Sequence, residues 1–301
     1  MAKSLGPKRL LWLDIDRAAT DSEAALATVS DILGVRPAAR PTDADEAERA
    51  RLVRTDDRIH LTVEVLQTDG GDARLVRREI ELIAAPNVVV TIHEGESAAL
   101  GRFITGLGDT RLGLLTAGDL LSSLVDEVID DYFLLAERIE REIDELDQRA
   151  LHGRRGDQVL ADIVALRRRI GLVRRTLAPH RHALSALALP EMEAVETVGR
   201  PWPGLVDRLE AAMEAVEGLR EGLLGTFDIH MGRVSQHAND VMRTLTLLSA
   251  VLLPAIVLAG IMGMNFKLAF FEATANFWVV IAGMGALAVT IVVVALWRRW
   301  L

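Results

Sequence analysis

Two asparagines bracket a long uncharged stretch near the C-terminal end of the chain. Asn239 precedes this stretch, and Asn265 lies at its far end within the tripeptide Gly263-Met264-Asn265. An amide oxygen can accept a hydrogen bond from cation-bound water, or bind the cation itself, without the full charge of a carboxylate. Because Mg²⁺ gives up its water reluctantly, neutral oxygens at both ends of a path suit it better than a cage of fixed charges. The chemistry indicated is the passage of a cation.

The residues between the asparagines follow one another in steps of three and four, which keeps their side chains in a single stripe along a helix. The stripe consists of Asn239, Met242, Leu245, Ser249, Leu253, Ile256 and Gly260. We predict that it lines the path. The alternative is an ordinary helix-packing seam, because small and apolar residues line most interfaces between membrane helices.

Two uncharged runs position this stripe. Residues 244–266 and 273–297 contain no Asp, Glu, Lys, Arg or His. Each run exceeds the roughly 20 residues that a helix needs to cross about 30 Å of hydrocarbon. We therefore predict two transmembrane helices joined by the short extracytoplasmic turn 267–272. Because one such hairpin cannot enclose a path, several copies must form a ring around it.

The charges that flank the two runs predict the orientation of the hairpin. Arg243 precedes the first run and the basic tail 298–301 follows the second, whereas the turn offers only Lys267 against Glu272. Positive charge remains on the cytosolic side, so both chain ends are expected in the cytosol and the protein in the inner or plasma membrane. The first 17 residues contain no apolar core long enough for a secretory signal.

The composition excludes several other classes of function. Among 301 residues, 50% are hydrophobic and 26% are charged, with a net charge of −9 and no cysteine. An acidic balance argues against a nucleic-acid partner, and the lack of cysteine excludes a thiolate metal site. The sequence contains no phosphate-binding glycine loop, nucleophile elbow or HExxH motif, so we expect neither an enzyme nor an organic cofactor.

The residues that precede the predicted membrane spans change in sequence pattern along the chain. Short runs rich in β-branched residues, each bounded by Pro, Gly or Asp, predict strands at 10–16, 59–67, 78–86 and 87–95, and a capped pattern predicts a helix at 20–34. We interpret residues 1–118 as a cytosolic α/β domain. Residues 119–243 follow as a long-helix region, so the fold class is α+β.

Three helices are predicted in the long-helix region. Amphipathic patterns span residues 120–151 and 158–187, and Pro179 is expected to kink or interrupt the second of them. The third begins near Gly204 and continues into the membrane without another proline until Pro254. The carboxylates between residues 126 and 147 are interpreted as a solvated helix face.

Several segments resemble one known family. NDVMRTLTLLSAVLLPAIVLAGIMGMNF (239–266) closely resembles the first transmembrane helix and Gly-Met-Asn signature of the CorA family of divalent-cation channels and transporters. LVDEVIDDYF (124–133), VVVTIHEG (88–95) and the terminal WRRWL are similar to further family segments. The resemblance implies a funnel-shaped homopentamer that passes Mg²⁺, and also Co²⁺ or Ni²⁺, down its electrochemical gradient.

The resemblance also implies roles for residues of the stripe. Gly263, Met264 and Asn265 would form the outer mouth that receives the hydrated cation, and Asn239 a polar ring near the cytosolic side. The apolar constrictions would be Met242, Leu245 and Leu253. A ring of such side chains can gate by excluding water.

The family further implies a regulatory Mg²⁺ site between neighbouring copies. Asp228 lies where a ligand on the long helix is expected, and Asp69 is a possible partner. Gly204 stands where the family has another acidic residue, with Asp207 one turn later. The same sensor is therefore not implied in full.

Two alternatives remain open. The outer segment KLAFFEATANFW departs from the family pattern, so a proton-coupled Zn²⁺ transporter of the related ZntB branch is one rival. His180 with His182, and His230 with His237, provide too few converging ligands for a zinc site and are interpreted as surface or inter-subunit histidines. The other rival is a membrane-anchored scaffold or sensor that does not conduct.

Overall fold

The computed structural model divides into two compact units, Met1–Phe227 and Asp228–Leu301. The residues described are 2–5, 10–19, 24, 25, 27, 29, 31, 51–55, 58–68, 75–106, 116–152, 156–187, 204–264 and 274–298.

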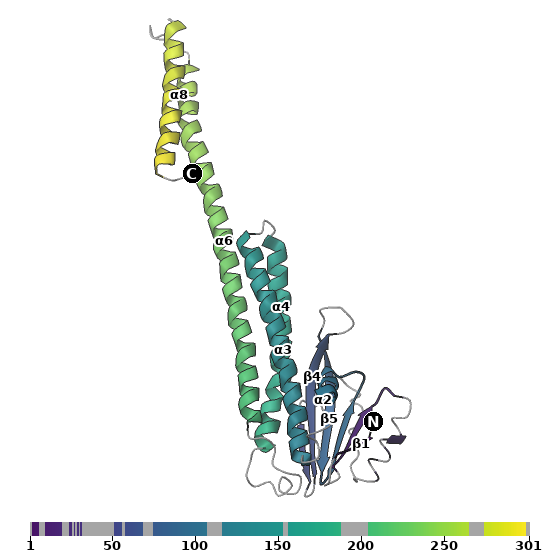
Figure 1. Cartoon of the computed structure of the whole chain (residues 1–301). Coiled ribbons are helices and arrows are strands. Elements are labelled where there is room, and N and C mark those ends of the chain that lie inside the picture. The colour runs from purple at the N-terminus through teal and green to yellow at the C-terminus, as the bar shows by residue number, and fades with distance from the viewer. Residues whose placement is uncertain are drawn as a thin grey trace. The chain divides into compact units, whose positions relative to one another are not determined.

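A six-stranded mixed sheet forms the N-terminal part of the first unit, in the order β1-β2-β6-β5-β4-β3 (Figure 1). Strands β2 and β6 run parallel, and every other neighbouring pair is antiparallel. The strands are β1 (Ala2–Leu5), β2 (Leu10–Asp16), β3 (Arg51–Thr55), β4 (Arg58–Thr68), β5 (Leu75–Ala85) and β6 (Val88–His93). The four predicted strands are confirmed, and the two short edge strands β1 and β3 were not predicted.

Local sequence explains the centre of the sheet. Alternate apolar residues of β4, from Ile59 to Val65, are fully buried, as the period of a strand requires. Pro86 and Asn87 connect β5 to β6, and Asn87 has a φ of 63°. Proline followed by a residue with positive φ is the pattern of a type II turn. One face of the sheet carries an apolar cluster made of Ile15, Val29, Ile83, Val90 and Ile92.

The helices of the first unit confirm the long-helix prediction. They are α2 (Ala98–Gly106), α3 (Ala117–His152), α4 (Gly156–Leu187) and the beginning of α6 (Leu205–Met262). Thr116 starts α3 as a capping box, because its hydroxyl accepts from the Asp119 amide at 3.1 Å and its own amide donates to the Asp119 carboxylate at 2.9 Å. Pro179 lies inside α4, so the predicted interruption does not occur. Those residues of 20–34 that are described are helical.

The acidic start of α3 is paired with arginines rather than simply solvated, which corrects the sequence interpretation. Arg208 of α6 forms ion pairs with Asp126, at 2.7 Å, and with Asp130. Arg102 of α2 contacts Asp131 at 2.7 Å and Glu127 at 3.3 Å. These contacts hold α2 and α6 against α3.

A buried polar contact joins the sheet to α3 and α4. The backbone amide of Glu64 donates to Nε2 of His180 at 3.0 Å, and the Tyr132 hydroxyl donates to the Glu64 carbonyl at 2.7 Å. Nδ1 of His180 faces the carbonyls of Thr176 and Leu177, so Nδ1 carries the proton. His180 is only 2% exposed, so its prediction as a surface histidine was wrong. Burial lowers the pKa of His180 to about 4, despite its hydrogen bonds.

The second unit contains the C-terminal part of α6 and the helix α8 (Thr274–Trp297). Both helices are long and apolar enough to cross a membrane, with mean hydropathy of 2.4 in the most apolar stretch of α6 and 2.7 in that of α8. The predicted spans agree with these helices, although α6 ends at Met262 rather than at residue 266. The turn 267–272 and the tail residues 299–301 lie outside the described residues.

Candidate permeation helix

The signature tripeptide lies where α6 ends. The Gly263 amide donates to the Ala259 carbonyl at 2.9 Å, in the normal helical register. The Met264 amide donates instead to the Ile261 carbonyl at 3.2 Å, three residues back, so the last turn tightens. Gly263 and Met264 are exposed, and Asn265 lies outside the described residues. The helix therefore presents the first two signature residues at its C-terminal end.

Every member of the predicted stripe lies on α6 and is exposed in the single chain. The side chain of Met242 is 67% exposed and that of Leu253 is 65% exposed. Because α6 is continuous through this region, the steps of three and four place the members on one face. The structure thus brings together the seven residues that the sequence selected.

Exposure alone does not single out this face. Leu248 and Leu252, which lie off the stripe, are 55% and 47% exposed. Polarity separates the faces better, because Asn239 and Ser249 belong to the stripe. The hydroxyls of Thr244 and Thr246 donate to helix carbonyls four residues earlier, at 2.9 and 2.8 Å, so their protons are already engaged. Within the membrane-spanning part of α6, the stripe carries the hydroxyl of Ser249, for which the described residues provide no such acceptor.

Pro254 lies inside α6 without ending it. A proline has no backbone N–H, so the carbonyl of Ala250 loses the donor that a regular helix provides four residues later. In a membrane, such a carbonyl needs another partner, either a side chain or water.

The candidate regulatory carboxylates do not converge on one ion within the chain. Asp207 and Asp228 are both exposed on α6, and almost six helical turns separate them. Asp69 lies outside the described residues. Within the described parts of the chain, no group of three or more His, Asp or Glu side chains could hold a metal. Asp207 and Asp228 therefore do not form one site by themselves within a single chain.

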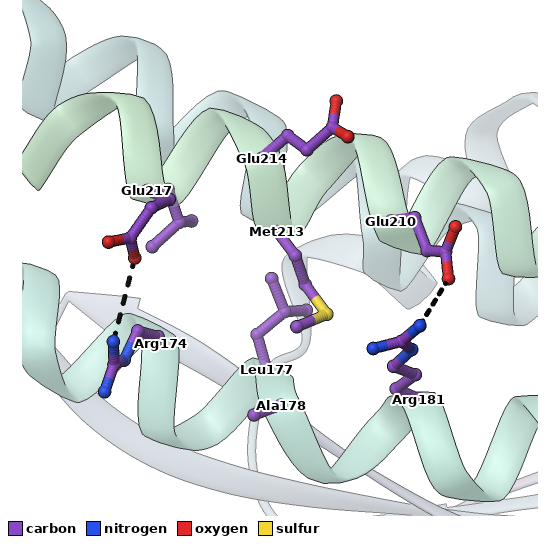
Figure 2. A pocket seen from close by; sticks show the side chains of 9 residues that line it. Arg174, Leu177, Ala178, Arg181, Glu210, Met213, Glu214 and Glu217 are labelled. Atoms are coloured by element: carbon purple, nitrogen blue, oxygen red, sulfur yellow. Dashed lines mark hydrogen bonds and ion pairs between the residues drawn. The ribbon is translucent and has the colours of Figure 1, made fainter. Parts of the chain in front are cut away.

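An open groove of about 580 Å³ lies between α4 and α6 in the first unit, and the sequence analysis missed it. Figure 2 shows Met213 of α6 and Leu177 of α4 in its centre, between two ion pairs. The ion pairs join Arg181 to Glu210 at 3.0 Å and Arg174 to Glu217 at 3.7 Å. The only signal in the sequence was the shared spacing, since both arginines and both glutamates are seven residues apart.

A second titratable pair lies where the parallel strands β2 and β6 end. Nε2 of His93 is 3.3 Å from Asp14, and Nδ1 of His93 donates to the Gly95 carbonyl at 2.6 Å. Burial on its own would lower the pKa of His93, but the hydrogen bond and the charge of Asp14 outweigh it and raise the pKa. Burial on its own would raise the pKa of Asp14, but the hydrogen bonds from His93 and Thr91 outweigh it and lower the pKa. The pair holds together the two parallel strands.

Comparison with known proteins places these features in a family. The family model described as "CorA-like Mg2+ transporter protein" matches residues 7–299. The chain is 28% identical over 281 residues to the cobalt/magnesium transport protein CorA of Thermotoga maritima, covering 91% of this chain and 79% of that protein.

Solved structures share the fold. The CorA magnesium transporter from Methanocaldococcus jannaschii aligns with a TM-score of 0.74 at 23% identity, over 97% of this chain and 92% of the other. The cytoplasmic domain of ZntB from Vibrio parahaemolyticus aligns with a TM-score of 0.54 at 16% identity, over 75% and 88% of the two chains. At these identities the likeness describes the fold and not the ion.

Proposed function

Because this chain belongs to the CorA-like Mg²⁺ transporter family, we propose that it carries Mg²⁺ across the membrane through a pore formed by five copies. As a member of that family it is a membrane transporter of divalent cations and not an enzyme. The proposal adds the ion, the number of copies and the direction, which is down the electrochemical gradient into the cytosol. Co²⁺ and Ni²⁺ are proposed as further substrates.

The observation that carries this proposal is that polar and apolar side chains lie together along one exposed face of α6. Asn239 and Ser249 share that face with the three apolar residues Met242, Leu245 and Leu253, and all five are exposed in the single chain. Polar side chains are unfavourable against lipid, so this face is expected to turn toward a water-filled axis. The two membrane helices of one chain cannot surround an axis, which is why several copies are needed.

Each part of the path has a proposed role. Gly263, Met264 and Asn265 form the outer mouth, where the Asn265 amide oxygens accept hydrogen bonds from the water shell of the arriving ion. Asn239 forms a second polar ring at the cytosolic end, and both chain ends lie in the cytosol. Between the two asparagines, rings of apolar side chains close the path when water leaves the space inside them.

Cytosolic regulation is proposed to depend on contacts between neighbouring copies. Asp228 and Asp207 are exposed, and carboxylates on adjacent copies attract divalent cations when no basic side chain neutralises them. Asp69 is proposed as the partner carboxylate. A bound ion would then tie two copies together and favour one state of the pore.

The test is uptake into proteoliposomes that contain a Mg²⁺-sensitive dye. Asn265→Ala is expected to lower the initial rate by roughly tenfold or more, because every copy loses a hydrogen-bond acceptor at the mouth. Asn276→Ala, at the start of α8, is the matched control and should retain the wild-type rate. Uptake unchanged by Asn265→Ala would contradict the proposed mouth.

The same liposomes distinguish the rival functions. Zn²⁺ uptake that requires a pH gradient, with no Mg²⁺ uptake, would favour a proton-coupled zinc transporter. The similarity to the fold of the ZntB cytoplasmic domain is the reason for measuring Zn²⁺ uptake. No flux of either ion would favour a non-conducting scaffold.

A further inference from the structure

We propose that Ser249 and the backbone carbonyl of Ala250 form a hydrated polar site in the membrane-spanning part of α6, between the apolar residues Leu245 and Leu253. The site would bind the water shell of a passing divalent cation. This inference rests on the proposed function, since it assumes that this face of α6 lines the path.

The carbonyl of Ala250 provides the first half of the site. Pro254 replaces the amide that would otherwise bond it, while α6 continues past the proline to Met262. The Thr290 hydroxyl of α8 donates to the Ala286 carbonyl at 2.8 Å. Hydrocarbon offers no donor at this depth, so water is the partner that fits the Ala250 carbonyl.

The hydroxyl of Ser249 provides the second half. Among the residues that the structure describes, it makes no hydrogen bond to the chain, unlike the hydroxyls of Thr244 and Thr246, five and three residues earlier. Ser249 is exposed and lies on the stripe. Its oxygen is therefore available to a ligand on the same side of the helix as Leu245 and Leu253.

The distance between Leu245 and Leu253 along α6 explains why a polar site between them matters. Leu245 and Leu253 are eight residues apart, about 12 Å along the helix, and Ser249 lies midway between them. Without these two groups, a hydrated ion would cross that distance with no polar contact. Apolar sections of this kind are the ones that exclude water from a pore. Ser249 and the Ala250 carbonyl divide the section into two shorter ones.

The chemistry of the two groups fits one class of ligand. Water bound to a divalent cation has its oxygen turned to the metal, so it presents hydrogens outward and needs acceptors. A carbonyl oxygen and a hydroxyl oxygen are both acceptors, and neither carries a charge that would trap the ion. The site is thus suited to a cation that keeps its water, and Mg²⁺ keeps its water more firmly than other common divalent cations.

The first experiment measures whether the site is wet, without requiring transport. The chain contains no cysteine, so the cysteine of a Ser249→Cys variant is its only thiol. The rate at which this thiol is modified therefore measures how well water reaches position 249. In the reconstituted full chain, a water-soluble methanethiosulfonate reagent is expected to modify Ser249→Cys at least about tenfold faster than Val251→Cys, because thiolate forms only where water reaches the thiol. Val251 lies at nearly the same depth on the opposite face of α6. Equal modification rates, or modification of neither variant, would overturn the proposal.

The contribution of the Ala250 carbonyl is tested in the same assay. Adding Pro254→Ala to Ser249→Cys supplies the missing amide and occupies the carbonyl. Modification of the cysteine is then expected to slow severalfold. An unchanged rate would remove Ala250 from the site and overturn the two-group proposal.

The second experiment separates this inference from the proposed function. Ser249→Ala is expected to lower Mg²⁺ uptake about fivefold, the effect of one lost hydrogen bond. Thr244→Ala is the control, because Thr244 lies on another face of α6 and its hydroxyl donates to the Asp240 carbonyl. If the wild type transports Mg²⁺ and Ser249→Ala matches it, the polar site is wrong and the proposed function stands. If the wild type transports no divalent cation, both are wrong.

Discussion

His180 illustrates how a single buried side chain makes stability depend on pH. Its pKa in the folded protein is lowered to about 4 by burial, whereas an unperturbed histidine has a pKa near 6.5. Between these two values the unfolded chain binds the proton and the folded chain does not. The stabilisation is therefore present above about pH 6.5 and is lost as pH falls toward 4.

The corresponding prediction uses His180→Gln, whose amide oxygen can still accept from the Glu64 amide but does not titrate. Lowering the pH from 7 to 5 should destabilise the wild type by about 2 kcal/mol more than the variant, from a shift of this size. Urea unfolding of the full chain in detergent, followed by fluorescence at both pH values, measures the difference. Equal pH dependence in the two proteins would show that His180 is not held neutral.

His93 is predicted to have the opposite pH dependence. Its pKa is raised, because the hydrogen bond and charge of Asp14 outweigh the burial that would lower it. The pair stabilises the fold fully below the unfolded pKa of about 6.5, and this stabilisation is lost as pH rises through the folded pKa. We expect wild type and His93→Gln to differ most in unfolding midpoint near pH 6 and to converge at pH 9. A difference that grows toward pH 9 would contradict the pairing.

At the scale of elements, the ion pairs of Arg208 are predicted to hold α6 on α3. Replacing it as Arg208→Met keeps much of the side-chain volume but leaves Asp126 and Asp130 without their shared cation. Because the groups are partly exposed, we expect a loss of about 1 kcal/mol in the free energy of unfolding. Urea titration of the full chain at pH 7 measures it.

Arg149→Met is the control for that prediction. Arg149 also joins two helices, through a single ion pair with Asp162 at 2.7 Å, but both side chains are more than 40% exposed. Exposed single pairs contribute little, so a smaller loss is expected. A loss equal to that of Arg208→Met would mean that the shared carboxylates add nothing.

Most helices and strands could be predicted from the sequence, because their apolar residues recur with a regular period over a long enough segment. The alternating β4 and β5 strands and the 36 residues of α3 have patterns that local rules recognise. The edge strands β1 and β3 have only four and five residues, and pairing with a neighbour defines them more than their own pattern does. Pro179 was expected to kink or interrupt α4, yet the helix continues through it, because the packing of a long helix outweighs the loss of one hydrogen bond.

Tertiary contacts were less predictable than elements. The stripe on α6 followed from spacing along one helix, so the sequence alone was sufficient to select it. The partners of the acidic residues at the start of α3 were missed, because Arg102 and Arg208 come from helices 25 and 78 or more residues away in the sequence. The role of His180 was missed for the same reason, since its partner Glu64 is 116 residues distant.

At the scale of the whole molecule, the composition of α6 argues for assembly. The membrane part of one chain leaves the stripe uncovered, and lipid gives no partner to the Ser249 hydroxyl. A ring of copies removes this hydroxyl from lipid, and the closed symmetry of rings limits the number of copies. Five is the number of copies that we propose.

Native mass spectrometry of the full chain from detergent is expected to show five copies. Asn239→Leu is an informative variant, because it removes the polar group without removing volume. If the amide matters for the path and not for association, Asn239→Leu should remain pentameric while Mg²⁺ uptake falls. If the amide holds the copies together through hydrogen bonds, the variant should dissociate into smaller species, as polar contacts between membrane helices contribute about 1 kcal/mol each. A wild type that is monomeric or dimeric would remove the basis for a central path, because two membrane helices per chain could not then enclose one.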